Sequence, residues 1–259
     1  MNITIASTSN QGERATNQDQ IGEVVGPRSA CFVVCDGIAG LPGGEIAAKV
    51  ARDTILLNFD GEKHLDAQSI RQYIAHANHA IRQQQQSAQY SKMGTTLVSL
   101  FIDRDYQLAY WAHAGDSRLY LFRRGYVYAT TRDHSLVQQM VDAGYQTNGI
   151  NSNLLYFALG LSEERDATYG DVLQLEDGDV FLLCTDGFWH NFTQDELEQS
   201  LHMVNSPVEW LSLMQQAWDK NGNASCADNY SAIAVWIGSP QETTLLHSLT
   251  DAERFLSHM

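Results

Sequence analysis

The chain has 259 residues, of which 44% are hydrophobic and 10% aromatic, so it can bury a core and is not a disordered protein. Its formal net charge of −15, from 31 acidic and 16 basic residues, argues against nucleic-acid or anionic-membrane partners, because both attract basic proteins. No apolar run reaches the ~18 residues that span a membrane, and the N-terminus lacks the basic and apolar regions of a signal peptide. We therefore expect a cytoplasmic protein with no membrane or nucleic-acid partner, and the acidic surface favours a monomer.

The four cysteines carry no CxxC pair, and three of them lie in or beside apolar runs. They are Cys31, Cys35, Cys184 and Cys226. This usage is typical of buried free thiols in a reducing compartment.

Hydrophobic periodicity predicts strands and helices along most of the chain. In chain order they are a strand over Cys31–Cys35, a helix over Glu45–Leu57, a helix through Ile70–Ile81, strands over Thr95–Ile102, Gln107–His113, Ser117–Phe122 and Val180–Cys184, a helix in "NSPVEWLSLMQQAW" (205–218) and a strand over Tyr230–Ile237. In the last helix, Ser206 is the expected N-cap and Pro207 fits the first turn.

Short connectors fix how these strands pair. Arg104–Tyr106 and Arg123–Gly125 each leave about three residues between strands, which allows antiparallel hairpins only, because a parallel pair needs a long crossover. Two consecutive helices interrupt the strands, so we predict an α+β fold with helices outside one or two antiparallel sheets. We expect one domain over residues 1–238, followed by a polar tail over 239–259 with one weak helical pattern.

Aspartates recur where apolar strands begin or end. They are Asp36 in "FVVCDG", Asp116 in "WAHAGDSR", Asp186 in "VFLLCTDG" and Asp228 in "CADNYSAIAVWI". A single Asp-Gly at a strand end is usually a turn, but four such sites would converge if the strands are neighbours. Clustered carboxylates repel one another and need a compensating cation, and hard oxygen ligands favour Mg²⁺ or Mn²⁺. The pattern favours metal-assisted hydrolysis, with two ions placed for phosphoryl displacement.

Arg14 in "GERATNQD" is the basic residue best placed to join these carboxylates. An arginine binds a phosphate through two parallel hydrogen bonds. The alternative interpretation is a solvated surface arginine. Arg14 is one of only two basic residues before Asp36, and Asn17 and Asp19 follow it closely.

Seven motifs occur in the order typical of one known family. They are "RATNQD", "VVCDGIAG", "MGTTLVSLF", "AHAGDSRLYLFRRG", "TRDHSLV", "LEDGDVFLLCTDGF" and "DNYSAIAV". From about Gly12 to Ile237 the chain resembles protein phosphatase 2C, the PPM family of metal-dependent serine/threonine phosphatases, in its compact bacterial form. The resemblance implies a four-layer α-β-β-α sandwich, in which two antiparallel sheets pack together with helices outside.

The resemblance also implies roles for particular residues. Asp36 resembles the ligand that bridges two core Mn²⁺ or Mg²⁺ ions, with the Gly37 carbonyl beside it, and Asp186 and Asp228 resemble the remaining carboxylate ligands. Asp19 resembles an acidic residue that reaches the second metal, often through water, and Asp116 one that helps to bind a third, weaker ion. Arg14 resembles the arginine that holds the substrate phosphate, while Thr95 and Thr96 are expected to support the site. Catalysis would depend on Asp36 and Arg14, with a metal-bridging hydroxide attacking phosphoserine or phosphothreonine.

The sequence departs from the family pattern in its glycine loop. The family usually carries a histidine there, whereas "DGIAGLPGGE" (36–45) has none, and Ala39 replaces a usual glycine. The proton for the leaving group must then come from another side chain or from a metal-bound water. His113 and His134 lie in matching motifs, but the favoured interpretation of each is a buried histidine that only supports the site or the core. The variable flap, "QMVDAGYQTNGINSNLLYFALG", is short.

Three functions remain open at this point. The first is an active protein phosphatase that counteracts a serine/threonine kinase in type VI secretion or other signalling. The second is a catalytically weak member of the fold that binds phosphoproteins or regulates a partner. The third is a hydrolase of small phosphate esters, for which no sequence feature argues. The complete carboxylate set and Arg14 favour the first, because buried like charges without a catalytic use are costly to keep.

Overall fold

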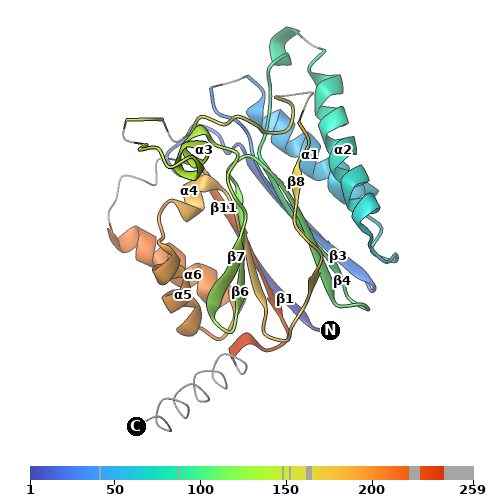
Figure 1. Cartoon of the computed structure of the whole chain (residues 1–259), viewed down its shortest axis with the longest axis vertical. Coiled ribbons are helices and arrows are strands. Elements are labelled where there is room, and N and C mark those ends of the chain that lie inside the picture. The colour runs from blue at the N-terminus through green and yellow to red at the C-terminus, as the bar shows by residue number, and fades with distance from the viewer. Residues whose placement is uncertain are drawn as a thin grey trace.

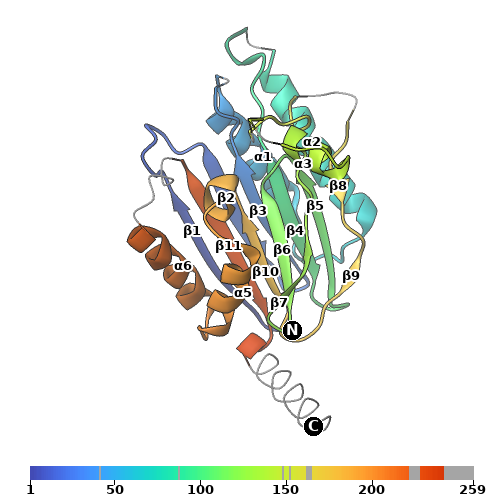
Figure 2. The same ribbon diagram turned by 60° about the vertical axis from the view of Figure 1, so that its left-hand side comes forward.

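The computed structural model describes residues 1–241 apart from positions 41, 87, 148, 152, 162–164 and 222–227, and the side chains of 218–221 are not described. The described strands form two antiparallel sheets that pack face to face, with helices on both outer sides (Figures 1 and 2). This is the four-layer α-β-β-α sandwich that the resemblance implies. Most of the predicted tail over 239–259 lies outside the described residues, as does Cys226.

The first sheet has the strand order β1-β11-β10-β6-β7 within the described residues. Its strands are β1 (Ile3–Asn10), β6 (Arg118–Arg123), β7 (Tyr126–Thr130), β10 (Val180–Cys184) and β11 (Tyr230–Ile237). The central strands β10 and β11 are buried along their whole length. The first strand of the chain and the last described strand are neighbours in this sheet, because β1 pairs with β11 from Ile3↔Ile237 to Asn10↔Tyr230.

The second sheet has the order β2-β3-β4-β5-β8, and β9 also pairs with β5. Its strands are β2 (Asp19–Val25), β3 (Ser29–Asp36), β4 (Leu97–Asp103), β5 (Leu108–Ala114), β8 (Thr168–Tyr169) and β9 (Leu173–Gln174). Each of the pairings is antiparallel, as the short connectors predict.

The helices divide between the two outer faces and the upper end of the molecule in Figure 1. They are α1 (Gly44–Asn58), α2 (Ala67–Gln84), the 3₁₀ turn η1 (Ala88–Tyr90), α3 (Leu136–Asp142), α4 (Asp186–Trp189), α5 (Gln194–His202) and α6 (Pro207–Asn221). Apolar residues of α1 and α2 pack on the second sheet, and those of α5 and α6 pack on the first. A third apolar cluster, which includes Phe32, Leu100 and Phe181, fills the space between the sheets.

The three predicted helices are confirmed as α1, α2 and α6. The side chain of Ser206 accepts a hydrogen bond from the Glu209 N–H at 3.1 Å, as expected of an N-cap. The strand predicted to start at Thr95 starts instead at Leu97. The hydroxyl groups of Thr95 and Thr96 contact the backbone of Asp36 at the end of β3, and the Thr95 N–H donates to the Leu159 carbonyl. Cys31, Cys35 and Cys184 are buried free thiols, as predicted. Among the described residues, no helix is long and apolar enough to cross a bilayer.

Candidate metal centre

The register of the strands brings the predicted aspartates to the same end of both sheets. In the first sheet, the end of β10 at Cys184 lies opposite the starts of β6 and β11, at Arg118 and Ala232. Asp186 follows β10, whereas Asp116 and Asp228 precede β6 and β11, so antiparallel pairing gathers all three. In the second sheet, Asp19 at the start of β2 lies directly opposite Asp36 at the end of β3. The convergence that the sequence left as an assumption is therefore a consequence of the topology.

These residues surround an open cavity of about 110 Å³. Six of the seven predicted site residues line it: Arg14, Asp36, Gly37, Asp116, Asp186 and Asp228. The other lining residues are Gln18, Ile38, Ala39, Thr96, Asn153, Leu155 and Asn229. Asp19 is the exception, because it is only 3% exposed and lies outside this lining.

Asp19 has one satisfied and one unsatisfied carboxylate oxygen. Its Oδ2 accepts a hydrogen bond from the Thr185 hydroxyl at 3.0 Å. Its Oδ1 is buried and has no hydrogen-bond partner. A buried carboxylate oxygen without a donor is costly, and a cation or an ordered water would satisfy it. Asp19 therefore has an unsatisfied buried oxygen, and it lies directly across the strand pair from Asp36.

Burial and mutual repulsion disfavour the charged form of these carboxylates. Burial, followed by the charges of Asp19, Asp186, Asp116 and Asp228, raises the pKa of Asp36 far above its usual value. Burial likewise raises the pKa of Asp19 to about 7 and that of Asp116 to about 8, and Asp186 adds repulsion to both. The pKa of Asp186 is raised for the same first reason. Such a cluster stays charged at neutral pH only when positive charge is brought to it.

Arg14 lies at the rim of the cavity and contacts the cluster directly. Its Nη2 donates to Asp228 Oδ2 at 2.7 Å, with both side chains more than one third exposed. The loop that carries Arg14 is held by Asn229, whose Nδ2 donates to the carbonyls of Gln11 and Thr16 at 2.8 and 3.0 Å. Arg14 is therefore paired with Asp228 at the rim of the cavity, and any anion bound there would compete with Asp228 for its guanidinium.

The glycine loop after β3 is shaped by close backbone contacts. A Cβ built on Gly37 would lie 2.4 Å from the backbone of Gly44, where α1 begins, so only glycine fits. Thr95 and Thr96 fix Asp36 from the other side: the Thr95 hydroxyl donates to the Asp36 carbonyl at 2.8 Å, and the Asp36 N–H donates to the Thr96 hydroxyl at 2.9 Å. The supporting role expected of the two threonines matches these contacts.

His113 and His134 lie behind the site rather than in it. Their rings stack with centroids 4.6 Å apart, and burial lowers the pKa of both, that of His134 to about 4. The Gly115 N–H donates to His134 Nδ1 at 3.1 Å, which holds the turn that carries Asp116. Neither ring lines the cavity, nor does any other histidine of the described residues. The source of a proton for a leaving group is therefore not a histidine of the cavity wall.

The donor chemistry of the cavity fits hard divalent cations. Its ionisable ligands are all carboxylates, and the buried Oδ1 of Asp19 lacks a partner, which suits Mg²⁺ or Mn²⁺ and not zinc. In the part of the chain that the structure describes, no group of three or more His, Cys, Asp and Glu side chains is already arranged to hold an ion. One carboxylate oxygen of the cavity, Asp228 Oδ2, is engaged by Arg14.

Sequence reasoning missed several residues that build the site. Asn229 and Thr185 are adjacent to predicted ligands, and each ties a second loop or strand to them. Their polar side chains beside Asp228 and Asp186 were the available signal. Gln18 also lines the cavity, and its N–H donates to Asn229 Oδ1 at 2.8 Å.

The chain belongs to the protein phosphatase 2C family, whose sequence profile matches residues 7–227, and it is an enzyme of the serine/threonine phosphatase class.

Individual relatives agree with this assignment. Protein phosphatase PhpP of Streptococcus pneumoniae is 30% identical over 234 residues, which cover 86% of this chain and 92% of the relative. The catalytic domain of the serine/threonine protein phosphatase PstP, solved in complex with two manganese ions, superposes with a TM-score of 0.78 at 25% identity, over 92% of this chain and 99% of that one. PppA of Pseudomonas aeruginosa, described as a key regulatory component of its T6SS, is 28% identical with a TM-score of 0.75, over 91% and 97% of the two chains.

Proposed function

We propose that the chain hydrolyses phosphoserine and phosphothreonine in proteins at a binuclear Mn²⁺ or Mg²⁺ centre. The observation that carries this proposal is the cavity itself, where Asp36, Asp116, Asp186 and Asp228 come from both sheets to face Arg14. Burial and the charges of neighbouring carboxylates raise the pKa values of Asp36, Asp116 and Asp186, so a bound cation would stabilise the charged forms of these three side chains.

We assign the site residues either to metal binding or to phosphate binding. Asp36, the Gly37 carbonyl, Asp186 and Asp228 would hold the two core ions. Asp19 would help to hold the second of them, and Asp116 would help to hold a weaker third ion. Bound divalent cations supply Lewis acidity, which lowers the pKa of a water and offsets the charge of the phosphate. Arg14 would bind the phosphate through its guanidinium and orient it for in-line attack.

The test is phosphatase activity of the purified protein on a phosphothreonine peptide and a chromogenic phosphate ester, with and without Mn²⁺. We expect turnover that depends on metal and falls by at least about 100-fold in Asp36→Asn, since a bridging ligand is lost. Hydrolysis that persists in EDTA, or full activity of Asp36→Asn, would contradict the binuclear mechanism.

A phosphoprotein-binding module with little turnover is the second candidate. It is favoured by the Arg14–Asp228 ion pair and by the lack of a preformed ion-binding group among the described residues. Mn²⁺ binding without hydrolysis of any phosphorylated substrate would support this candidate against the first.

We propose phosphoproteins of a kinase-regulated system as substrates, with a type VI secretion component as one instance. The similarity to PppA supports that choice, because PppA is described as a T6SS regulator. Phosphoproteome comparison of cells with and without the gene tests it. We expect phosphothreonine and phosphoserine sites to accumulate on few proteins, and an unchanged phosphoproteome would contradict the proposal.

A further inference from the structure

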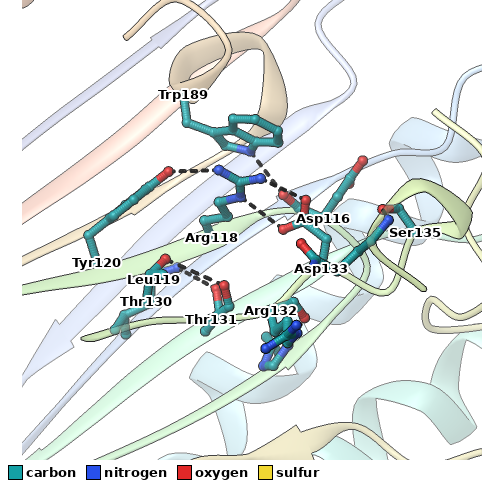
Figure 3. Close-up of polar contacts among 12 residues, drawn as sticks. Asp116, Arg118, Leu119, Tyr120, Thr130, Thr131, Arg132, Asp133, Ser135 and Trp189 are labelled. Carbon is teal, nitrogen blue, oxygen red and sulfur yellow. Dashed lines mark hydrogen bonds and ion pairs between the residues drawn. The ribbon is translucent and has the colours of Figure 1, made fainter. Parts of the chain in front are cut away.

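Arg118, Asp133 and Trp189 form a compact group beside Asp116, shown in Figure 3, and none of the three lines the cavity. Arg118 donates from Nε and Nη2 to the two carboxylate oxygens of Asp133, both at 2.8 Å, and its guanidinium carbon lies 3.3 Å from the Trp189 ring centroid. The Arg118 and Asp133 side chains are 24% and 8% exposed. We call these three residues the Arg118 cluster.

Trp189 connects the Arg118 cluster to two predicted metal ligands. It is the last residue of α4, which begins at Asp186, and its indole Nε1 donates to the backbone carbonyl of Asp116 at 2.9 Å. A single four-residue helix thus carries the Asp186 carboxylate at one end and the anchor of Asp116 at the other. Through this helix, the backbone of Asp116 is linked to the residue that carries the Asp186 carboxylate.

The residue after Asp133 contacts the other side of the same turn. The next residue, His134, makes two hydrogen bonds to Gly115: its N–H donates to the Gly115 carbonyl at 2.8 Å, and its Nδ1 accepts from the Gly115 N–H at 3.1 Å. Gly115 has φ +98°, and a Cβ there would lie 2.7 Å from Thr96, so the turn admits only glycine. The turn that carries Asp116 is therefore contacted on both sides, by Trp189 of the Arg118 cluster and by the residue that follows Asp133 of the same cluster.

The geometry points to Arg118, Asp133 and Trp189 as positioning residues that hold Asp116 at the distance from Asp186 that the outer, weaker cation requires. This inference rests on the role proposed for Asp116 above. A buried ion pair contributes little net stability, because desolvation offsets most of the attraction, whereas it fixes geometry well. Partners that orient metal ligands typically change metal affinity by about 10- to 100-fold when they are removed.

The same strand supplies a matched control at its far end. Arg123 is the last residue of β6, and its Nε and Nη2 donate to the two carboxylate oxygens of Asp179, both at 2.8 Å. Its guanidinium carbon lies 4.8 Å from the ring centroid of Tyr128. The Arg123 and Asp179 side chains are 13% and 0% exposed, so this ion pair is at least as enclosed as the Arg118–Asp133 pair. It contacts none of the residues that line the cavity in the interactions described. Arg123→Lys therefore measures what loss of such a fork does to the fold alone.

The experiment counts bound Mn²⁺ by titrating metal-free protein and following the electron paramagnetic resonance signal of the free ion, without substrate. The variants are Arg118→Lys, which loses the fork, and Trp189→Phe, which keeps a ring over Arg118 but loses the hydrogen bond to Asp116. Asp116→Asn identifies the weak site, and Arg123→Lys is the control. Thermal melts confirm that each variant is folded, and the conservative Trp189→Phe keeps the test decisive if Arg118→Lys does not fold.

We expect Arg118→Lys and Trp189→Phe to weaken the third site by roughly 10-fold or more, as Asp116→Asn does, while the two tight ions bind as in the wild type and Arg123→Lys changes neither. A third-site affinity within twofold of wild type in both variants would overturn the inference, and so would equal weakening in Arg123→Lys. A wild type that binds two ions and no third would overturn it while leaving the core centre intact. Absence of any saturable Mn²⁺ binding would overturn the proposed function as well.

Discussion

At the scale of single residues, the site is a set of buried carboxylates that depend on added positive charge. Asp19 and Asp116, with pKa values raised to about 7 and about 8, are protonated in metal-free protein at mildly acidic pH. In the unfolded chain an aspartate has a pKa of about 3.9. Folded-state values above the unfolded value mean that their contribution to stability is full below about pH 4 and is lost as pH rises through 7 and 8.

Metal-free protein should therefore become less stable between pH 5 and pH 8.5. Thermal melts in EDTA test this, and we expect the midpoint to fall by several degrees across this range. Saturating Mn²⁺ should abolish or reverse the trend, because cation binding needs the deprotonated carboxylates. A midpoint in EDTA that is constant or rises with pH would contradict the proposed electrostatics of the cluster.

Arg14 is the residue whose removal should affect substrate binding most directly. Arg14→Ala should lower kcat/KM for a phosphothreonine peptide by roughly 10- to 100-fold, because charge-assisted hydrogen bonds to the phosphate contribute about 1.5–3 kcal/mol. The exposed Arg28, which contacts His64 in the second sheet's loop region, provides the control variant Arg28→Ala. Equal kcat/KM in Arg14→Ala and Arg28→Ala would show that Arg14 is a solvated arginine with no role in substrate binding.

At the scale of elements, the backbone after β3 packs directly against the start of α1, where Gly37 lies against Gly44. Gly37→Ala would place a Cβ 2.4 Å from the Gly44 backbone, which cannot yield without moving α1 or Asp36. We expect a loss of roughly 1–3 kcal/mol in the free energy of unfolding, with weaker Mn²⁺ binding. Gly144→Ala is a useful comparison, since that glycine faces open space but has φ +76°, so it carries only the backbone strain. Denaturant melts that show equal losses in both would contradict the steric explanation.

The elements that sequence predicted are those with continuous apolar runs. β3, β10 and β11 are buried on both faces, and their sequences show it. β1 and β7 were not predicted, because half-exposed edge strands mix polar and apolar residues, and β1 is defined by a partner more than 220 positions away. α4 is too short to show a helical period, so Asp186 was placed at a strand end although it opens a helix.

For the site, the sequence predicted which carboxylates could converge but not which contacts hold them. Asp36, Asp116, Asp186 and Asp228 were found from their places beside apolar strands, whereas Asp19 and its Thr185 contact depend on the packing of two sheets. The Arg14–Asp228 ion pair joins residues 214 positions apart. Long-range contacts of this kind leave no local pattern to read.

At the scale of the whole molecule, the net charge of −15 bears on substrate choice. A phosphopeptide flanked by Lys and Arg should show a higher kcat/KM than one flanked by Glu, because the acidic surface attracts the first and repels the second. The difference should shrink between 20 mM and 500 mM salt, since screening shortens the electrostatic range to a few Å. A preference for the acidic peptide, or one that salt leaves unchanged, would show that local contacts dominate.

The most direct test of the central claim is reconstitution of metal-free protein with Mn²⁺ while hydrolysis of a phosphothreonine peptide is followed. The carboxylate cavity predicts no turnover in EDTA, activity that rises as the two core ions bind, and Asp36→Asn that stays inactive at every Mn²⁺ concentration. Turnover by metal-free protein, or Asp36→Asn with wild-type activity, would contradict the account.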